Sequence, residues 1–224
     1  MLLELYSGVL RKRKLTPGLA SLVALVAEAG CGLHWAAASV RDTVFLHKGE
    51  NTLEVLLTAE QISRRVTELA AEIDAHFAGR RPHLVCILKG ACVFLADLMR
   101  ALTVESSLDF MGVSSYDGGS AASGEVRITK DLDHSLEGLV VLLVEDIVDT
   151  GLTLNYLRQM LLRRNPASLK VAALLDKPSR RVQPVVLDFV GFEVPDRFLV
   201  GYGLDFEQRY RHLPDLCLLP EAAA

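Results

Sequence analysis

The sequence predicts an α/β domain built on a mostly parallel central sheet that is flanked by helices. Four short apolar runs, at 84–88, 108–113, 139–144 and 169–175, alternate with segments whose apolar residues recur at helical spacing. Alternation of this kind indicates strands joined by crossover helices. The chain has 224 residues and is 50% hydrophobic, so it can bury a substantial core without disulfides or a structural metal. We therefore expect one main domain.

The first regular element is expected to start at Thr58. The sequence Thr58-Ala59-Glu60-Gln61 has the form of a capping box, and apolar residues follow it at helical spacing as far as Phe77. The run 84–88 is wholly apolar and bounded by charge, as in a strand that is covered on both faces. Residues 91–102 then predict the helix after that strand.

We expect a loop between two strands. The first strand is predicted at 108–113, and the second is a short strand at 125–129 that turns back after the loop. The loop begins Ser114-Ser115-Tyr116-Asp117-Gly118-Gly119-Ser120, and its serines and glycines neither fill a core nor hold a helix. Its length is typical of an active-site lid, so we expect a mobile lid over 114–125. The run 139–144 is the most hydrophobic and β-branched in the chain and should be the central strand.

The remainder of the chain predicts a helix, a strand and then a change of character. Leucines on one side of 154–164 predict the helix, and 169–175 returns as a strand. Beyond it, short strands and turns replace helices. We expect three short strands, at 185–190, 198–202 and 216–219, in a small C-terminal subdomain.

Composition argues against several classes of protein. A net charge of −4 does not suit a protein built to bind nucleic acid, which needs a basic face to displace counterions, so no nucleic-acid partner is expected. Four cysteines and six histidines are scattered without the spacing of a zinc site. They favour reduced thiols in a cytosolic protein, and we expect a cytoplasmic location.

Residues 1–52 are interpreted as an N-terminal extension to a main domain over 53–219. A basic run at 11–14 precedes an apolar stretch at 19–26, which imitates a signal peptide. Glu28 and His34 interrupt the apolar segment, which is too short to span a bilayer. We expect an extra packed helix, an interface element, a mobile extension or an upstream start rather than export, and no membrane partner.

The segment 141–153, VLLVEDIVDTGLT, carries the candidate chemistry. A buried strand ends in Glu145 and Asp146 and turns through a glycine into a helix, and ligands of open α/β sheets bind at the carboxyl ends of such strands. Backbone N–H groups and two threonine hydroxyls at 150–153 would cradle a phosphate monoester. Acids beside that cradle repel phosphate, so sugar hydroxyls and magnesium are their expected partners. Taken alone, such an acid pair also occurs as ordinary helix-start decoration.

This run resembles the phosphoribosyl diphosphate motif of type I phosphoribosyltransferases, in the form used by the hypoxanthine-guanine phosphoribosyltransferase family. Four further segments resemble motifs of that family in the family's order along 53–219. They are Leu88-Lys89-Gly90 for the pyrophosphate loop, Ser115-Tyr116 for the start of the lid, LDKPSRR at 175–181 for purine selection, and VGYGLD at 200–205 with 209–213 for the C-terminal base and metal site. The form at 176–181 is similar to bacterial members.

The resemblance implies the type I phosphoribosyltransferase fold with a small C-terminal hood, and it implies a ligand for each matched residue. Glu145 and Asp146 would hold the ribose hydroxyls and, with Asp205, bind Mg²⁺. Arg211 would neutralise the leaving pyrophosphate, and the family carries a nonproline cis peptide at Lys89-Gly90. The residues implied to bind phosphoribosyl diphosphate or nucleotide are Lys89, Gly90, Ser115, Tyr116, Glu145, Asp146, Asp149, Thr150, Gly151, Leu152, Thr153 and Arg211.

Base recognition and catalysis are implied by the same resemblance. Asp149 would be the catalytic general base or acid at the imidazole edge of the purine. Lys177 would donate to the 6-oxo group, so that adenine is rejected, while Phe198 would stack on the purine and the backbone around Leu199 would bond its edge. Without the resemblance, Lys177 would be interpreted as a solvated charge, Phe198 as core and Lys89-Gly90 as an ordinary turn.

The implied activity is purine salvage. A homodimer or homotetramer would transfer the phosphoribosyl group of phosphoribosyl diphosphate to hypoxanthine or guanine with Mg²⁺, giving IMP or GMP and pyrophosphate. One alternative is a regulatory protein that senses phosphoribosyl diphosphate and binds nucleic acid, although the acidic charge and the set of Asp149, Lys177, Asp205 and Arg211 argue against it. A preference for xanthine or pyrimidine bases is the second alternative.

Overall fold

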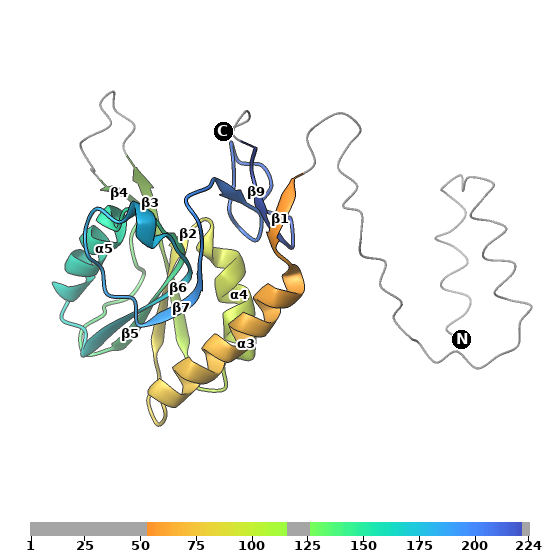
Figure 1. The fold of residues 1–224 in the computed structure, drawn as a ribbon. Coiled ribbons are helices and arrows are strands. Elements are labelled where there is room, and N and C mark those ends of the chain that lie inside the picture. The colour runs from red at the N-terminus through yellow and green to blue at the C-terminus, as the bar shows by residue number, and fades with distance from the viewer. Residues whose placement is uncertain (1–52, 116–125, 221–224) are drawn as a thin grey trace, which may run out of the picture. The chain divides into compact units, whose positions relative to one another are not determined.

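The computed structural model describes residues 53–115 and 126–220, and the expected extension, 1–52, lies outside them. The elements are β1 (Glu54–Leu57), α3 (Ala59–His76), β2 (His83–Leu88), α4 (Ala91–Ala101), β3 (Ser107–Ser115), β4 (Val126–Lys130), β5 (Val140–Val148), α5 (Leu152–Leu162), β6 (Ser168–Asp176), the 3₁₀ turn η2 (Pro178–Arg180), β7 (Phe189–Glu193), β8 (Leu199–Val200) and β9 (Leu216–Leu218). Figure 1 shows their arrangement.

The main sheet has the strand order β4-β3-β2-β5-β6-β7 within the described residues. Its strands run parallel except for β4, which pairs antiparallel with β3. The strand β5 lies between β2 and β6, so the prediction of a central strand is confirmed. The predicted α/β class with a mostly parallel sheet is also confirmed.

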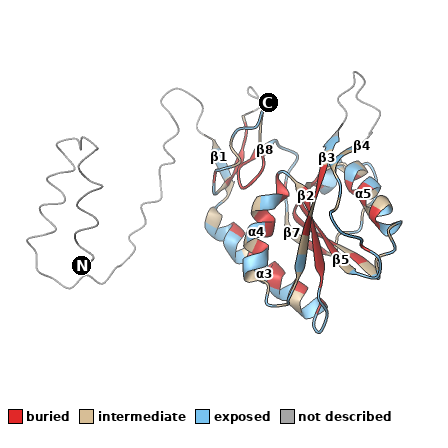
Figure 2. Cartoon of the chain, turned by 180° about the vertical axis from the view of Figure 1, so that it is seen from behind, coloured by how far each residue is buried: buried red, intermediate tan, exposed pale blue. Residues whose placement is uncertain are grey.

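Helices cover both faces of this sheet (Figure 1). One core joins α3 and α4 to one face, and a second core joins α5 to the other. The predicted capping box starts α3, where Gln61 N–H donates to Thr58 Oγ1 at 3.3 Å and Thr58 N–H donates to Gln61 Oε1 at 2.8 Å. Figure 2 shows buried residues concentrated in the strands and on the inward sides of the helices.

A second sheet, with the order β1-β9-β8, forms a small subdomain, as predicted. The strand expected in it at 185–190 belongs instead to the main sheet, where β7 pairs with β6. We call β1 together with residues 199–219 the hood. Two hydrogen bonds tie it to the helices, from Ala59 N–H to Asp215 Oδ1 and from the Tyr202 hydroxyl to Asp97 Oδ2, each 2.6 Å long. The sequence did not indicate β1, because this four-residue strand is stabilised by antiparallel pairing with β9 at the other end of the domain.

Several predicted boundaries were wrong. The central strand was expected to end at Val144, but pairing with β6 carries β5 to Val148, so the acid pair lies inside the strand. Residues 185–188 are not strand: β7 begins only at Phe189, and the β-branched Val186 is 63% exposed. Likewise β8 contains only two residues of the expected 198–202.

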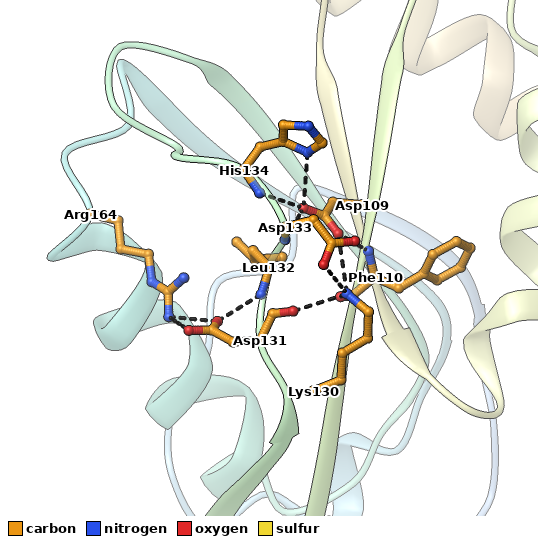
Figure 3. A network of polar contacts seen from close by, with 8 residues as sticks. All are labelled: Asp109, Phe110, Lys130, Asp131, Leu132, Asp133, His134 and Arg164. Atoms are coloured by element: carbon orange, nitrogen blue, oxygen red, sulfur yellow. Dashed lines mark hydrogen bonds and ion pairs between the residues drawn. The ribbon is translucent and has the colours of Figure 1, made fainter.

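A buried carboxylate, Asp109, fixes the connection after β4 (Figure 3). Its side chain is 2% exposed and accepts hydrogen bonds from the backbone N–H groups of Phe110, Asp133 and His134, at 2.7, 2.7 and 3.2 Å. Burial alone would raise the pKa of Asp109, but these bonds and the nearby Lys130 ammonium lower it below its ordinary value. No local sequence pattern indicated this network.

Candidate active site

The acid pair and the predicted phosphate loop meet in a cavity of about 250 Å³ at the carboxyl ends of β2 and β5. Its predicted lining residues are Lys89, Gly90, Glu145, Asp146, Asp149, Thr150, Gly151 and Thr153. Two neighbouring parallel strands end here, so residues from separate parts of the chain converge on one edge of the sheet.

The phosphate loop turns through Gly151, which has a φ of +83° and leads directly into α5. A side chain at this position would collide with the backbone carbonyl of Gln183. The first N–H groups of a helix have no intrahelical partner, so the start of α5 presents donors and the positive end of its dipole to the cavity. Leu152, a predicted phosphate-binding residue, is not among the residues that line this cavity or the larger one beside it.

The acid pair is held in an environment that disfavours its charge. Burial, helped by the neighbouring Asp146, raises the pKa of Glu145 well above its ordinary value. Burial also raises the pKa of Asp146 to about 6, although two backbone hydrogen bonds and the Arg211 charge oppose the rise. Hydroxyl donors or a cation would relieve this cost, because they stabilise the ionised form.

The pyrophosphate loop lies against the acid pair. The resemblance implied a cis peptide at Lys89-Gly90, and the structure has it one bond earlier, between Leu88 and Lys89. A Cβ built on Gly90 would overlap Oδ2 of Asp146 and lie 2.8 Å from its Cγ, and a Cβ on Gly203 would overlap the carbonyl oxygen of Gly90. The Lys89 ammonium donates to Gln208 Oε1 at 3.2 Å. Glycine is thus required at position 90, where this loop meets Asp146 of β5, and at position 203, where the hood meets the loop.

A larger cavity of about 700 Å³ adjoins the first and shares Asp146 and Asp149 with it. Lys177 lines it and is only 7% exposed, with its ammonium donating to the Arg197 carbonyl at 2.8 Å. Phe198 lines it and is 44% exposed, with its ring edge-to-face against Phe206. Lys177 is buried, so it is not the solvated charge that the sequence would indicate without the resemblance. Phe198 is exposed, so it is not a core residue.

The hood contributes an acid and a base to the larger cavity. Arg211 Nη2 lies 2.6 Å from Asp205 Oδ1, and Arg211 Nη1 donates to the Gly203 carbonyl at 2.7 Å. The other Asp205 oxygen accepts the N–H of Gln208 at 2.8 Å. These two residues, expected to contact pyrophosphate and metal separately, pair with each other here.

Two candidate residues belong to the start of the expected lid. The lid was expected to begin at Ser114, but pairing with β4 carries β3 through Ser114 to Ser115. Tyr116 and the rest of the expected lid, 116–125, lie outside the described residues. In the described part of the chain, no group of three His, Cys, Asp or Glu side chains is placed to hold a metal by itself. Among the same residues, no helix has the length and apolar character needed to cross a membrane.

The structure also adds polar residues that the sequence did not assign. Arg180 and Asp196 line the larger cavity, and Arg180 Nε lies 2.9 Å from Asp149 Oδ1. Arg180 belongs to the quoted segment 175–181, so its place in that motif was the available signal. Asp196 had no signal, because its position depends on the folding of the loop before β8.

Comparison with known proteins bears directly on this site. A family model described as "Phosphoribosyl transferase domain" matches residues 53–207. The hypoxanthine-guanine phosphoribosyltransferase of Bacillus subtilis is 48% identical over 169 residues, which is 75% of this chain and 94% of that protein. A solved hypoxanthine-guanine phosphoribosyltransferase of Bacillus anthracis has a TM-score of 0.73 at 39% identity, over 76% of this chain and 100% of that one. A solved hypoxanthine phosphoribosyltransferase of Staphylococcus aureus also has a TM-score of 0.73, at 44% identity, over 76% of this chain and 94% of that one.

The sheet, the phosphate loop after β5 and the family match define an enzyme of the phosphoribosyltransferase family, to which this chain belongs. The relatives are matched over almost their whole length. Within the family, the chain is therefore a member of the hypoxanthine-guanine phosphoribosyltransferases.

Proposed function

We propose that this enzyme transfers the 5-phosphoribosyl group of phosphoribosyl diphosphate to hypoxanthine or guanine, releasing pyrophosphate, in purine salvage. The observation that carries the proposal is the junction of two cavities at Asp146 and Asp149. One contains a phosphate cradle, and the other contains a buried ammonium and an exposed aromatic ring. A sugar that joins a phosphate to a base would span this junction.

The smaller cavity suits the ribose 5-phosphate. Residues 150–153 would bind the phosphate through backbone N–H groups and threonine hydroxyls. Glu145 and Asp146 would accept hydrogen bonds from the ribose hydroxyls, which favours the ionised form that burial disfavours. Lys89, Gly90 and Arg211 would bind the pyrophosphate, with Arg211 leaving Asp205 to do so. Ser115 and Tyr116 would start the lid.

The larger cavity suits the base. Its volume of about 700 Å³ lies in the range of small-molecule pockets. The Lys177 ammonium has three donors, one of which is used on Arg197, so another can reach a 6-oxo oxygen. Adenine would leave that buried donor unpaired, which disfavours its binding. Phe198 would stack on the ring, and the Leu199 backbone would bond its edge.

Mg²⁺ fits the donors at this site. Carboxylate oxygens are its preferred protein ligands, and it usually takes one or two of them together with substrate phosphates, so no cluster of three protein ligands is needed. Asp146 and Asp205 line the same cavity, and Glu145 adjoins Asp146. We propose that these three hold Mg²⁺ with the substrate, where it would neutralise charge on the pyrophosphate.

We propose that Asp149 handles the proton of the base. It lines both cavities, so its carboxylate would face the imidazole edge of a purine held by Lys177 and Phe198. There it would accept or return a proton as the purine N9 attacks the anomeric carbon. We further propose that the enzyme acts as a homodimer or homotetramer in the cytoplasm, which fractionation and light scattering would check.

The test is nucleotide formation from phosphoribosyl diphosphate and Mg²⁺ with hypoxanthine, guanine, xanthine, adenine and uracil. The natural chain should use the first two bases. Asp149→Ala should lose turnover, whereas Glu137→Ala, which removes an exposed acid before the opposite end of β5, should keep it. A folded protein that binds phosphoribosyl diphosphate but uses no base would overturn the proposal in favour of the sensor.

A further inference from the structure

Arg180 is a cation in the larger cavity that the proposed function leaves without a role. Its Nε lies 2.9 Å from Asp149 Oδ1, and its Nη1 lies 3.3 Å from Asp196 Oδ1. Both acids also line that cavity. One planar guanidinium therefore joins the proposed acid-base residue to an acid on the loop that carries Phe198. We call that loop, residues 195–198, the purine loop.

The 3₁₀ turn η2 explains why Arg180 lies where it does. Lys177 is the N-cap of this turn, and Arg180 is its last residue. Both cations line the larger cavity. Lys177 donates to the Arg197 carbonyl, and Arg180 pairs with Asp196. Two cations of this turn, Lys177 and Arg180, thus hold the adjacent residues Arg197 and Asp196 of the purine loop.

Arg180 is the partner that the described residues provide for the Asp149 carboxylate. This contact is an ion pair without hydrogen-bond geometry: among the described residues, the buried Oδ1 of Asp149 has no hydrogen-bond partner, and no other cation pairs with the carboxylate. The contact is made at Oδ1, so Oδ2 is left without a partner among the described residues. Without the guanidinium, the Asp149 and Asp196 carboxylates would lose the cation that pairs with both of them, which disfavours their present arrangement.

The backbone around Arg180 is held independently of its side chain. The N–H groups of Val182 and Gln183 both donate to the Thr150 carbonyl, at 2.9 and 3.1 Å. The Arg180 N–H donates to the Lys177 carbonyl at 3.1 Å. Removing the guanidinium should therefore leave the turn and the phosphate loop in place.

We propose that Arg180 is a positioning residue that fixes the Asp149 carboxylate toward the base and, through Asp196, fastens the purine loop to it. This inference rests on the proposed function of Asp149. It requires no contact between Arg180 and the substrate. Its consequence is that base binding and proton handling depend on one side chain, whereas binding of phosphoribosyl diphosphate does not.

The test compares steady-state kinetics of Arg180→Gln, Asp196→Asn and the double variant, with Arg163→Gln at the exposed end of α5 as the control. In Arg180→Gln, kcat should fall about 30-fold and the KM for hypoxanthine should rise about 5-fold, because Asp149 and the purine loop are both released. The KM for phosphoribosyl diphosphate should change less than about twofold.

The partial variants separate the two contacts. Asp196→Asn should raise the KM for hypoxanthine and leave kcat near the natural value. The double variant should match Arg180→Gln, because residues of one network are not additive. Arg180→Lys should recover part of kcat, since it keeps the charge but lacks the planar fork.

Failure of this inference is distinguishable from failure of the proposed function. An active natural chain whose Arg180→Gln variant keeps its kcat would overturn the positioning role alone. Equal rises in the KM of both substrates would do the same, since they would indicate a general loss of structure. A natural chain that uses no base at all would overturn both.

Discussion

Replacing Gly90 by alanine should disable the enzyme without unfolding it. Gly90 has φ −59° and ψ −46°, a helical conformation that alanine adopts readily, so the backbone is not strained. The added Cβ would overlap Oδ2 of Asp146 and lie 2.8 Å from its Cγ, closer than real Cβ atoms approach. The carboxylate is the movable partner, so it must swing away from its place in the cavity.

The expected size of the effect follows from that displacement. A misplacement of about 1 Å in a catalytic site can cost about 100-fold in rate, and the Asp146 oxygen must move at least that far. We expect kcat/KM to fall about 100- to 1000-fold, equivalent to about 3–4 kcal/mol of transition-state stabilisation. The midpoint of thermal unfolding should change by less than about 3 °C, because side-chain relocation costs little folding free energy.

Gly138→Ala is the matched control. Gly138 has a φ of +71° and open space where a Cβ would lie, and it precedes β5 at the end away from the acids. Alanine there should cost about 1 kcal/mol in unfolding free energy through strain and leave activity unchanged. Gly90→Ala should therefore lose activity and keep its stability, whereas Gly138→Ala should lose stability and keep its activity.

The assay is nucleotide formation with hypoxanthine, read alongside thermal unfolding by circular dichroism. Gly90→Ala should add no further loss in an Asp146→Ala background, because the smaller side chain leaves room for the new Cβ. Natural turnover in Gly90→Ala would refute the reasoning. An additional loss in the double variant would instead show that the pyrophosphate loop, rather than Asp146, is displaced.

Three further changes probe stability and base choice. Asp109→Asn should lower the unfolding free energy by about 3 kcal/mol near neutral pH. Since folding lowers the pKa of Asp109, the carboxylate stabilises the fold fully above its ordinary pKa, and this contribution is lost as the pH falls through the folded pKa. The difference in unfolding free energy between the natural chain and the variant, measured by urea titration, should therefore close below about pH 4. Thr58→Ala should cost about 1 kcal/mol by removing the bond from the Gln61 N–H, and an unchanged urea midpoint would contradict that role. Lys177→Gln should lower kcat/KM for hypoxanthine about 100-fold and reduce the ratio of kcat/KM for hypoxanthine to that for adenine, because an amide both donates and accepts. If Lys177 does not select the base, competition assays with both bases would show an unchanged ratio.

Local patterns allowed the elements with strong signals to be predicted. The capping box at Thr58 and the apolar stripe after it were sufficient to locate α3. The predictions of strands failed where pairing between segments far apart in the sequence determines whether a strand forms and where it ends. The strand β1 exists because β9 pairs with it, and β5 extends past Val144 because β6 continues beside it.

The candidate site divides in the same way. Glu145, Asp146, Asp149 and the loop at 150–153 lie in one continuous motif, so the sequence located them together. Their contacts could not be predicted from it, because Arg180 reaches Asp149 from another segment.

By itself, the sequence determined the α/β class, the family resemblance and the identity of the residues proposed to hold phosphate, ribose and base. These depend on local periodicity and on motifs that are contiguous in the chain. The tertiary structure decided which side chains pair, such as Arg211 with Asp205, and which groups lose water, such as Lys177. The physical reason is that burial and ion pairing depend on distances between segments remote in sequence, which the packing of the hood and helices on the sheet sets.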